Sequence, residues 1–455
     1  MTDLCQQNNQ AVFRSANLPD EVKSEKVQRQ EQHLSVVQKE RSLYNSMVQD
    51  AKKTVKEKNI VDLSPSSDLA NNRMHYSFDY AQQVHYPSDP LQPGPVYFLV
   101  PRKCGIFGIC CEGIPQQVNY LINEGMCSSK GSNSVISYLH HFFANYGLGE
   151  SAVDLHCDNC SGQNKNRFVL WYLAWRVLVG LHKEISINFM IAGHTKFSPD
   201  WCFGLLKQSY RRTPVSSLGD ISEAVKHSMV TGVNVPQLVG TEDGTVIVPT
   251  YDWQSFLEPY FRPLPGMKKL QHFRFNSDNP GVVHYQNAPD EPEQSFQILQ
   301  TPNSFLTSTD IPVLQPPGLS SERQWYLHNK IREFVRDDAK DITCPQPQIA
   351  PSAPGPSTAP EVTSGPTAPL AGESSKPAKK ARGSKETKNL KPVPKGKTPK
   401  APEEAARSKP GSSKSEAAKR CRQDSDDSDN TEQLSKTTAA QTRTHRQIKK
   451  PAKFL

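Results

Sequence analysis

The feature that most constrains the fold is a change in the spacing of apolar residues along the first half of the chain. Apolar residues recur at helical spacing between residues 20 and 58, and they form short alternating or continuous blocks between residues 74 and 111. Helix-like and strand-like blocks then take turns up to about residue 210. This alternation predicts an α/β protein in which helices pack on a mixed sheet.

Three strand-like blocks come first, and alternating helices and strands follow. The blocks are MHYSFDY (74–80), PVYFLV (95–100) and GIFGICC (105–111). The later elements are a helix ending at Gly147, a strand over 151–158, a helix ending near Gly180, a strand over 185–192 and a helix capped by Ser198. The resulting order, β-β-β-α-β-α-β-α, is typical of the ribonuclease H-like fold, a mixed sheet with helices on both faces.

The segment over residues 20–58 predicts one amphipathic N-terminal helix. Its apolar positions, at steps of three, four or seven, are Val27, Leu34, Val37, Tyr44, Val48, Ala51 and Val55. Two interpretations remain open, a short coiled-coil seam of a homodimer and a helix packed on its own domain.

Composition divides the rest of the chain near residue 345. The formal net charge of +8 arises after that point, where basic side chains outnumber acidic ones and large apolar residues are scarce. A segment of this composition cannot bury enough apolar surface to order itself. We therefore expect an N-terminal helical region (1–66), a ribonuclease H-like domain (67–232), an appended subdomain or extension (233–345) and a disordered basic tail (346–455).

Several classes of protein are disfavoured by the sequence. The first residues lack the basic cluster and apolar core of a secretory signal. The longest apolar run, 168–181, is short for a membrane span and contains Arg176. The 10 cysteines are scattered rather than spaced as a disulfide framework, which favours reduced thiols in the cytosol or nucleus. We expect no membrane association.

Three aspartates occupy positions that such a fold brings together. Asp79 lies on the polar phase of the first strand, Asp158 ends the fourth strand, and Asp200 lies in the first turn of the last helix. Carboxylate oxygens are ligands that Mg²⁺ and Mn²⁺ accept, and two such ions can activate water and stabilise a leaving oxygen at a phosphodiester. The trio is therefore predicted to be catalytic and metal-binding. Taken singly, each is equally an edge residue, a turn former or a helix-start charge.

The turn LHCDNCSGQNKN (155–166) is a second candidate site. Cys157 and Cys160 have the spacing of a zinc half-site, but no second pair follows at the usual interval. Phosphate or substrate contacts near a helix N-terminus are the favoured interpretation. The predicted contacts are Asn159, Gln163, Asn164, Lys165 and, further along, His194. The alternative is that the amides cap the helix and His194 is simply buried.

The motifs DNCSGQNKN, FDYAQQVHYP and GHTKFSPDWCFGLLKQSYRRT carry a resemblance to a family. Over roughly residues 70–275 the chain resembles an uncharacterised family of animal proteins that expand in a transposon-like fashion. The shared domain of that family is of unknown function and is regarded as ribonuclease H-like. The resemblance implies this fold and a mobile-element ancestry, and the family has no established substrate.

These observations together predict a protein that acts on DNA. We expect a transposase- or endonuclease-derived protein that cleaves or transfers DNA strands, with a non-catalytic nuclear DNA-binding or scaffold protein as the alternative. The aromatic and basic run PLPGMKKLQHFRF is either a nucleic-acid surface or a packed extension. In the tail, KPAKKARGSK, with Lys379, Lys380 and Arg382, predicts importin recognition and a nuclear location.

Overall fold

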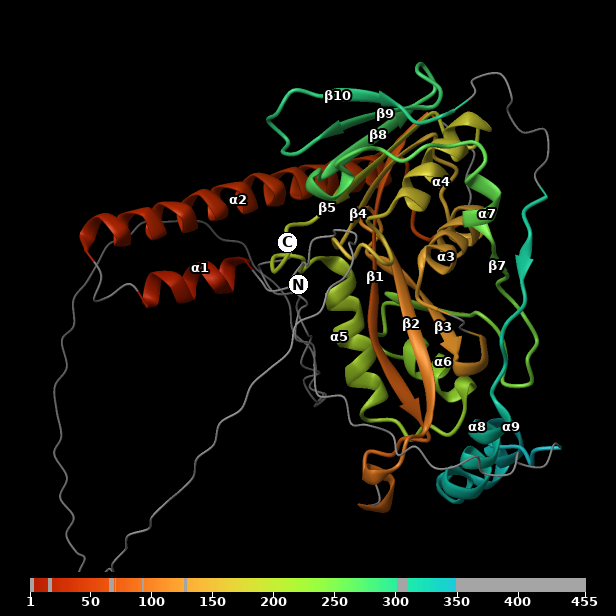
Figure 1. The fold of residues 1–455 in the computed structure, drawn as a ribbon. Helices are drawn as coiled ribbons and strands as arrows, with labels where there is room; N and C mark the ends of the chain where they lie inside the picture. The colour runs from red at the N-terminus through yellow and green to blue at the C-terminus, as the bar shows by residue number, and fades with distance from the viewer. Residues whose placement is uncertain are drawn as a thin grey trace, which may run out of the picture. The chain divides into compact units, whose positions relative to one another are not determined.

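A single mixed sheet forms the centre of the molecule (Figure 1). The computed structural model describes residues 4–14, 19–64, 69, 71–91, 94–126, 129–300 and 310–348. The predicted disordered tail (346–455), with Lys379, Lys380 and Arg382, lies outside these residues except for 346–348. The nine strands of the sheet have the order β10-β9-β8-β5-β4-β1-β2-β3-β6.

The middle of the sheet combines an antiparallel meander with two parallel strands. The meander consists of β1 (Arg73–Tyr86), β2 (Arg102–Cys111) and β3 (Gln116–Asn123), in antiparallel pairs. On the other side of β1, β4 (Ala152–Cys157) and β5 (Glu184–Phe189) follow in parallel. The outer strands are β6 (Asn234–Leu238), parallel to β3, and the antiparallel series β8 (His272–Asn276), β9 (Val282–Gln286) and β10 (Gln294–Gln297) beyond β5. Residues 233–300 thus contribute four strands to the same sheet.

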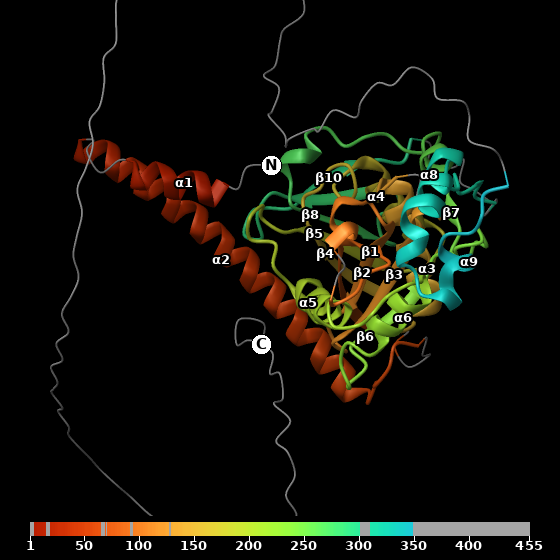
Figure 2. The same ribbon diagram turned by 90° about the horizontal axis from the view of Figure 1, so that it is seen from below.

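Helices cover both faces of the sheet, as Figure 2 shows. One face carries α3 (Ser132–Asn145), α4 (Arg167–Leu178) and α7 (Trp253–Leu257). The other carries α5 (Ser198–Tyr210), α6 (Leu218–Lys226) and part of the long helix α2 (Asp20–Glu57). The remaining elements are α1 (Leu4–Phe13), α8 (Ser321–Tyr326), α9 (Lys340–Thr343) and a small sheet of β7 (Thr250–Tyr251) and β11 (Val313–Leu314).

The alternation along β1 explains how one strand serves two different layers. Tyr76 and Phe78 are fully buried in the main core, where Tyr76 meets Phe142 of α3 edge-to-face at 5.1 Å. His75, Ser77 and Asp79 take the opposite phase. His75 meets the ring of Tyr44 from α2 at 5.4 Å between centroids. The apolar and polar phases of β1 therefore separate a hydrophobic layer from a polar one.

One strand assignment made from the sequence is wrong. Residues 95–100 do not form a strand, because Gly94–Phe98 is a 3-10 helix in which Tyr97 and Phe98 are exposed. Pro95 and Pro101 lack the N–H groups that a ladder requires. The third strand of the meander is instead β3. Its buried amide side chains interrupt the apolar pattern by which a strand is recognised in the sequence. Gln117 and Asn119 are fully buried there and bond to each other at 2.8 Å.

The apolar positions of α2 have two different environments. Tyr44, Val48, Ala51 and Val55 are buried against the molecule's own sheet domain. Val27 and Leu34, in the N-terminal half beside α1, are exposed. The C-terminal half of the predicted seam is thus an intramolecular contact.

The apolar run after residue 167 forms the buried helix α4. Asn166 caps this helix by accepting from the backbone N–H groups of Phe168 and Val169, at 3.1 Å each. Arg176 is buried within it and bonds to His182 and Tyr172. Across the described ranges, no helix combines the length and apolar character that spanning a membrane requires.

Candidate active site

Asp79 and Asp158 lie beside each other because of the parallel register of β1 and β4. Ser77 of β1 is opposite His156 of β4. Two residues further, the same register aligns Asp79 with Asp158, the first residue after β4. Residues at equal register on parallel strands point to the same face. The end of β4 therefore presents a pair of carboxyl groups on adjacent central strands.

Asp200 approaches the pair from α5, which packs over β1 and β2. The close approach depends on Gly108, the β2 residue opposite Asp79. A Cβ atom at Gly108 would lie 2.7 Å from the ring of Phe203 on α5. The sequence placed the helix cap at Ser198, but the cap residue is Phe197. Asp200 accepts from its N–H at 3.1 Å.

Each of the three carboxyl groups has one local hydrogen-bonding role. An oxygen of Asp79 accepts from the backbone N–H of Tyr80 at 2.7 Å. One oxygen of Asp158 accepts from Cys160 N at 3.0 Å and from Asn164 Nδ2 at 2.7 Å. The second oxygen of each group has no hydrogen bond within the described residues. Each aspartate thus retains an oxygen for a ligand.

The surroundings of the three aspartates disfavour the state in which all three carboxyl groups are ionised. Burial, then Asp158 and then Asp200 raise the pKa of Asp79 from 3.8 to about 7. Burial also raises the pKa of Asp200, against the opposing effect of its bond to Phe197 and of nearby basic groups. Asp158 and Asp200 are therefore both near enough to Asp79 to disfavour its charge. A cation between them would relieve the repulsion.

The donor types suit a hard cation, but the trio is not closed around one ion. Each group offers a carboxylate oxygen, the ligand that Mg²⁺ and Mn²⁺ prefer. Among the residues that the structure describes, no three His, Cys, Asp or Glu side chains lie close enough together to hold a single metal ion. This applies equally to Cys157 and Cys160, whose predicted zinc half-site was already the weaker interpretation.

The turn after β4 holds its polar residues in specific roles. Asn164 is fully buried and binds Asp158, so it orients a candidate ligand. Lys165, also buried, donates to Asn159 Oδ1 at 2.8 Å, while Asn159 donates in turn to the carbonyl of Met190. Gln163 contributes its backbone carbonyl to Asn166 at 3.0 Å. Helix capping thus falls to Asn166, not to Asn159 or Asn164.

His194 lies at the base of the N-terminal helices. Its Nε2 is 3.2 Å from Nε2 of His33 on α2, and its carbonyl accepts from Arg41 at 2.9 Å. The residue therefore joins the loop after β5 to α2. No bond between His194 and the three aspartates occurs within the described residues.

A buried polar network under α2 could not be read from sequence. Both oxygens of Glu112 are engaged, by Tyr44 at 2.7 Å and by Ser198 at 2.6 Å. Further along α2, Glu40 bonds to His272 of β8 at 3.0 Å. These contacts fix α2 and the start of α5 on the face that carries Asp79. The only local signal was a lone Glu ending the apolar run of β2.

Fold and site together define a mixed α/β protein with a carboxylate trio on one face of its central strands. Within this chain, residues 101–291 match a domain of unknown function, DUF7869. The match includes Asp158 and Asp200 and begins after Asp79. Neither a curated protein nor a solved structure matches the chain.

Proposed function

We propose that this chain is a ribonuclease H-like protein of mobile-element ancestry that cleaves or transfers DNA strands with the help of Mg²⁺ or Mn²⁺. The observation that carries the proposal is the pairing of Asp79 with Asp158 on adjacent parallel strands, with Asp200 close enough to perturb Asp79. The central strand order β5-β4-β1-β2-β3 and the alternation of helices support the same fold class.

In this proposal the three aspartates hold the cations and the turn after β4 holds the substrate. Asp79, Asp158 and Asp200 would bind the metal, which activates water and stabilises the leaving oxygen. Asp79, whose pKa is about 7, would hold the cation in its deprotonated form. Asn164 keeps Asp158 in orientation through their 2.7 Å bond. Asn159, Gln163, Lys165 and His194 are the proposed substrate contacts.

The test is strand cleavage and strand transfer on random-sequence DNA with Mg²⁺ and with Mn²⁺. Asp158→Asn should lower the rate by at least about a hundredfold, because it removes a charge from the metal site. Asp278→Asn, at an exposed position between β8 and β9, is the matched control and should retain the wild-type rate. Equal rates for Asp158→Asn and the wild type would contradict the proposal.

A non-catalytic nuclear DNA-binding or scaffold protein is the second candidate. It is favoured by the local roles of the acids, since Asp158 orders a turn and Asp200 accepts from the N–H of Phe197 at the start of α5. It is also favoured by the lack, among the described residues, of a group that holds one ion. In that case the wild type and Asp158→Asn bind DNA equally and neither cleaves it. The importin, homodimer and nuclear assignments remain proposals of the same kind.

A further inference from the structure

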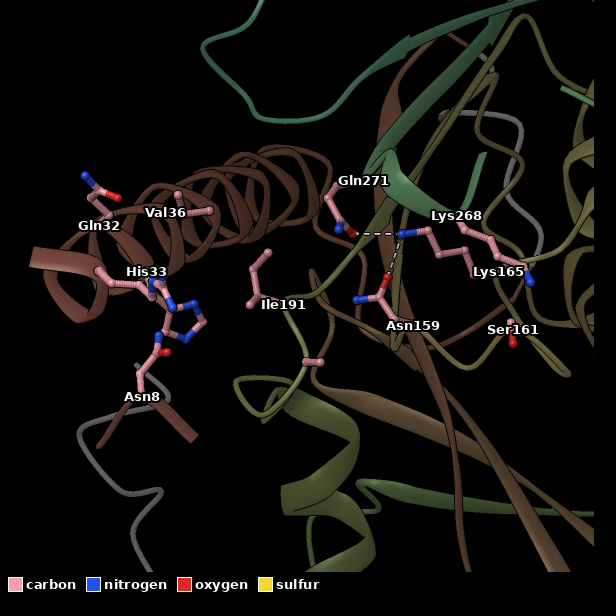
Figure 3. A pocket seen from close by; sticks show the side chains of 12 residues that line it. Asn8, Gln32, His33, Val36, Asn159, Ser161, Lys165, Ile191, Lys268 and Gln271 are labelled. Atoms are coloured by element: carbon pink, nitrogen blue, oxygen red, sulfur yellow. Dashed lines mark hydrogen bonds between the residues drawn. The ribbon is translucent and has the colours of Figure 1, made fainter. Parts of the chain in front are cut away.

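A pocket beside the carboxylate trio is lined by basic residues from distant parts of the chain. Its volume is about 640 Å³. It lies between the helices α1 and α2, the turn after β4, the loop after β5 and the segment before β8 (Figure 3). Every fully charged side chain that lines it is basic, namely Arg29, Lys165 and Lys268, and none is an Asp or Glu. We call this cavity the basic pocket.

Lys165 is a buried cation without an anionic partner among the described residues. Its side chain lies almost wholly out of solvent, and Nζ donates to Asn159 at 2.8 Å and to Gln271 at 3.1 Å. Both acceptors are neutral amides, whereas buried ammonium groups are normally paired with a charge. Nζ also lies 5.2 Å from the centre of the Phe189 ring, so its third neighbour is an aromatic face and not an anion. Burial lowers the pKa of Lys165 to about 8.

Asn8 of α1 offers a second unused donor on the other side of the basic pocket. The residue is only 7% exposed, and its Nδ2 has no acceptor within the described part of the chain. Figure 3 shows it next to His33, across the pocket from Lys165. A buried ammonium paired only with neutral groups on one wall and an unmet amide donor on the other indicate a ligand that supplies negative charge and acceptor oxygens.

The remaining wall is apolar and lies close to the acids. Val36, Ile191 and Ala192 form it. Asn159, which also lines the pocket, directly follows Asp158. Donors at one side and an apolar surface at the other match a phosphate joined to a sugar and base. A volume of this size takes one nucleotide and excludes a base-paired helix.

We propose that the basic pocket binds one nucleotide of a single-stranded nucleic acid, with its phosphate at Lys165 and its base against Val36 and Ile191. This rests on the proposed function, since it supplies the contact that holds a strand next to the aspartates. It adds a partner class, unpaired strands, and gives α1 and α2 a role in binding them. Free inorganic phosphate is the other source of the same chemistry.

The experiment measures binding of the 5′-phosphorylated dinucleotide pTpT to the full chain by titration calorimetry. EDTA is present, so that no metal and no cleavage are needed. The variant Arg29→Ala/Lys268→Ala removes two exposed cations of the pocket. The matched control is Arg211→Ala/Lys226→Ala, which removes one exposed Arg and one exposed Lys from the ends of α5 and α6. Both variants have the same net charge.

The pocket variant should bind pTpT at least about tenfold more weakly than the wild type, and the control should stay within about twofold. Lys165→Met, with folding checked by circular dichroism, should weaken binding similarly. Equal affinity of the pocket variant and the control overturns the proposal. Inorganic phosphate that binds as tightly as pTpT assigns the pocket to free phosphate and overturns the nucleic-acid part.

The same titration separates this inference from the proposed function. If binding is present and cleavage is absent in the wild type, the pocket stands while the catalytic proposal fails. If cleavage occurs but the pocket variant binds normally, the pocket assignment fails alone.

Discussion

Asp79 is a carboxyl group whose own surroundings oppose its charge. Burial and the two neighbouring aspartates act in the same direction, and the single hydrogen bond from Tyr80 opposes them only in part. A side chain in such a position weakens the folded state unless a ligand compensates it. Asp79 is thus the residue at which the stability of the protein and its proposed metal binding are linked.

Replacing Asp79 by Asn should stabilise the protein in a pH-dependent way. The pKa is about 7 in the folded protein and near 3.8 when unfolded, so rising pH over that interval favours the unfolded state. The variant should therefore gain about 1 to 3 kcal/mol over the wild type at pH 8, and almost nothing at pH 4. Urea unfolding at both values measures this, with Asp278→Asn as the control.

Added Mn²⁺ should make the wild type more stable than Asp79→Asn at pH 8. The cation stabilises the wild type by binding the folded state, and Asp79→Asn loses that gain. A variant that is less stable than the wild type at pH 8 without metal would contradict the charge repulsion. Equal stabilisation of both proteins by Mn²⁺ would place the ion elsewhere.

Among the secondary-structure elements, the helix α2 is the one that connects the end of β2 with β8. Its polar side chains reach the end of β2 through Tyr44 and Glu112, and reach β8 through Glu40 and His272. These bonds lie in a buried layer, where a missing partner is costly. Because Ser198 shares Glu112, the position of α2 also sets the first turn of α5, from which Asp200 extends.

Tyr44→Phe should destabilise the protein by about 1 to 3 kcal/mol, because Glu112 loses a donor while buried. Tyr97→Phe, which alters an exposed ring, should change stability by less than about 0.5 kcal/mol. Urea unfolding gives both numbers, and hydrogen exchange should show reduced protection along the C-terminal half of α2 in the first variant. Similar losses in the two variants would show that the Tyr44 hydroxyl has no such role.

Much of the element order could be predicted because periodicity is a local property. This periodicity predicts the helix over 20–58, the strands β1, β2, β4 and β5, and the helix α5. Apolar periodicity does not predict β3, because a buried position of this strand is polar. Asn119 occupies it and donates a hydrogen bond to Asn234 on the neighbouring strand at 3.0 Å. A pairing of that kind depends on a residue 115 positions away.

The candidate site could likewise be predicted only in part from the sequence. The approach of Asp79 to Asp158 follows from strand order, which sequence reasoning could supply. The basic pocket could not be foreseen, because Asn8, Lys165 and Gln271 meet only through tertiary packing. Lys165 was singled out as a phosphate contact, yet nothing local indicated that its amide partner would be Gln271.

At the scale of the whole molecule, charge is unevenly distributed along the chain. The residues after 345 carry a formal net charge of +11, and the rest of the chain carries −3, which together give +8. Within the described domain, no acidic side chain lines the basic pocket, whereas the basic groups Lys196, Lys207 and Arg41 act on Asp200 of the carboxylate trio.

A fluorescent reporter fused to residues 346–455 should accumulate in the nucleus. Changing Lys379, Lys380 and Arg382 together to alanine should abolish most of that accumulation, because importin grooves bind clustered basic side chains. Changing Lys395, Lys397 and Lys400 removes the same charge outside the cluster and should leave it largely intact. The measurement is the nuclear-to-cytoplasmic fluorescence ratio. If the unchanged reporter with residues 346–455 is distributed like the fluorescent protein alone, the nuclear assignment is contradicted.

The bond between Glu40 and His272 has a consequence for synthesis on the ribosome. The two residues are 232 positions apart, so α2 is made long before its partner on β8 exists. The strands that carry Asp79 and Asp158 emerge in between, and they can pair while α2 still lacks that anchor. The pocket walls supplied by α1 and α2 are therefore completed only when Lys268, Gln271 and the strand after them have been translated.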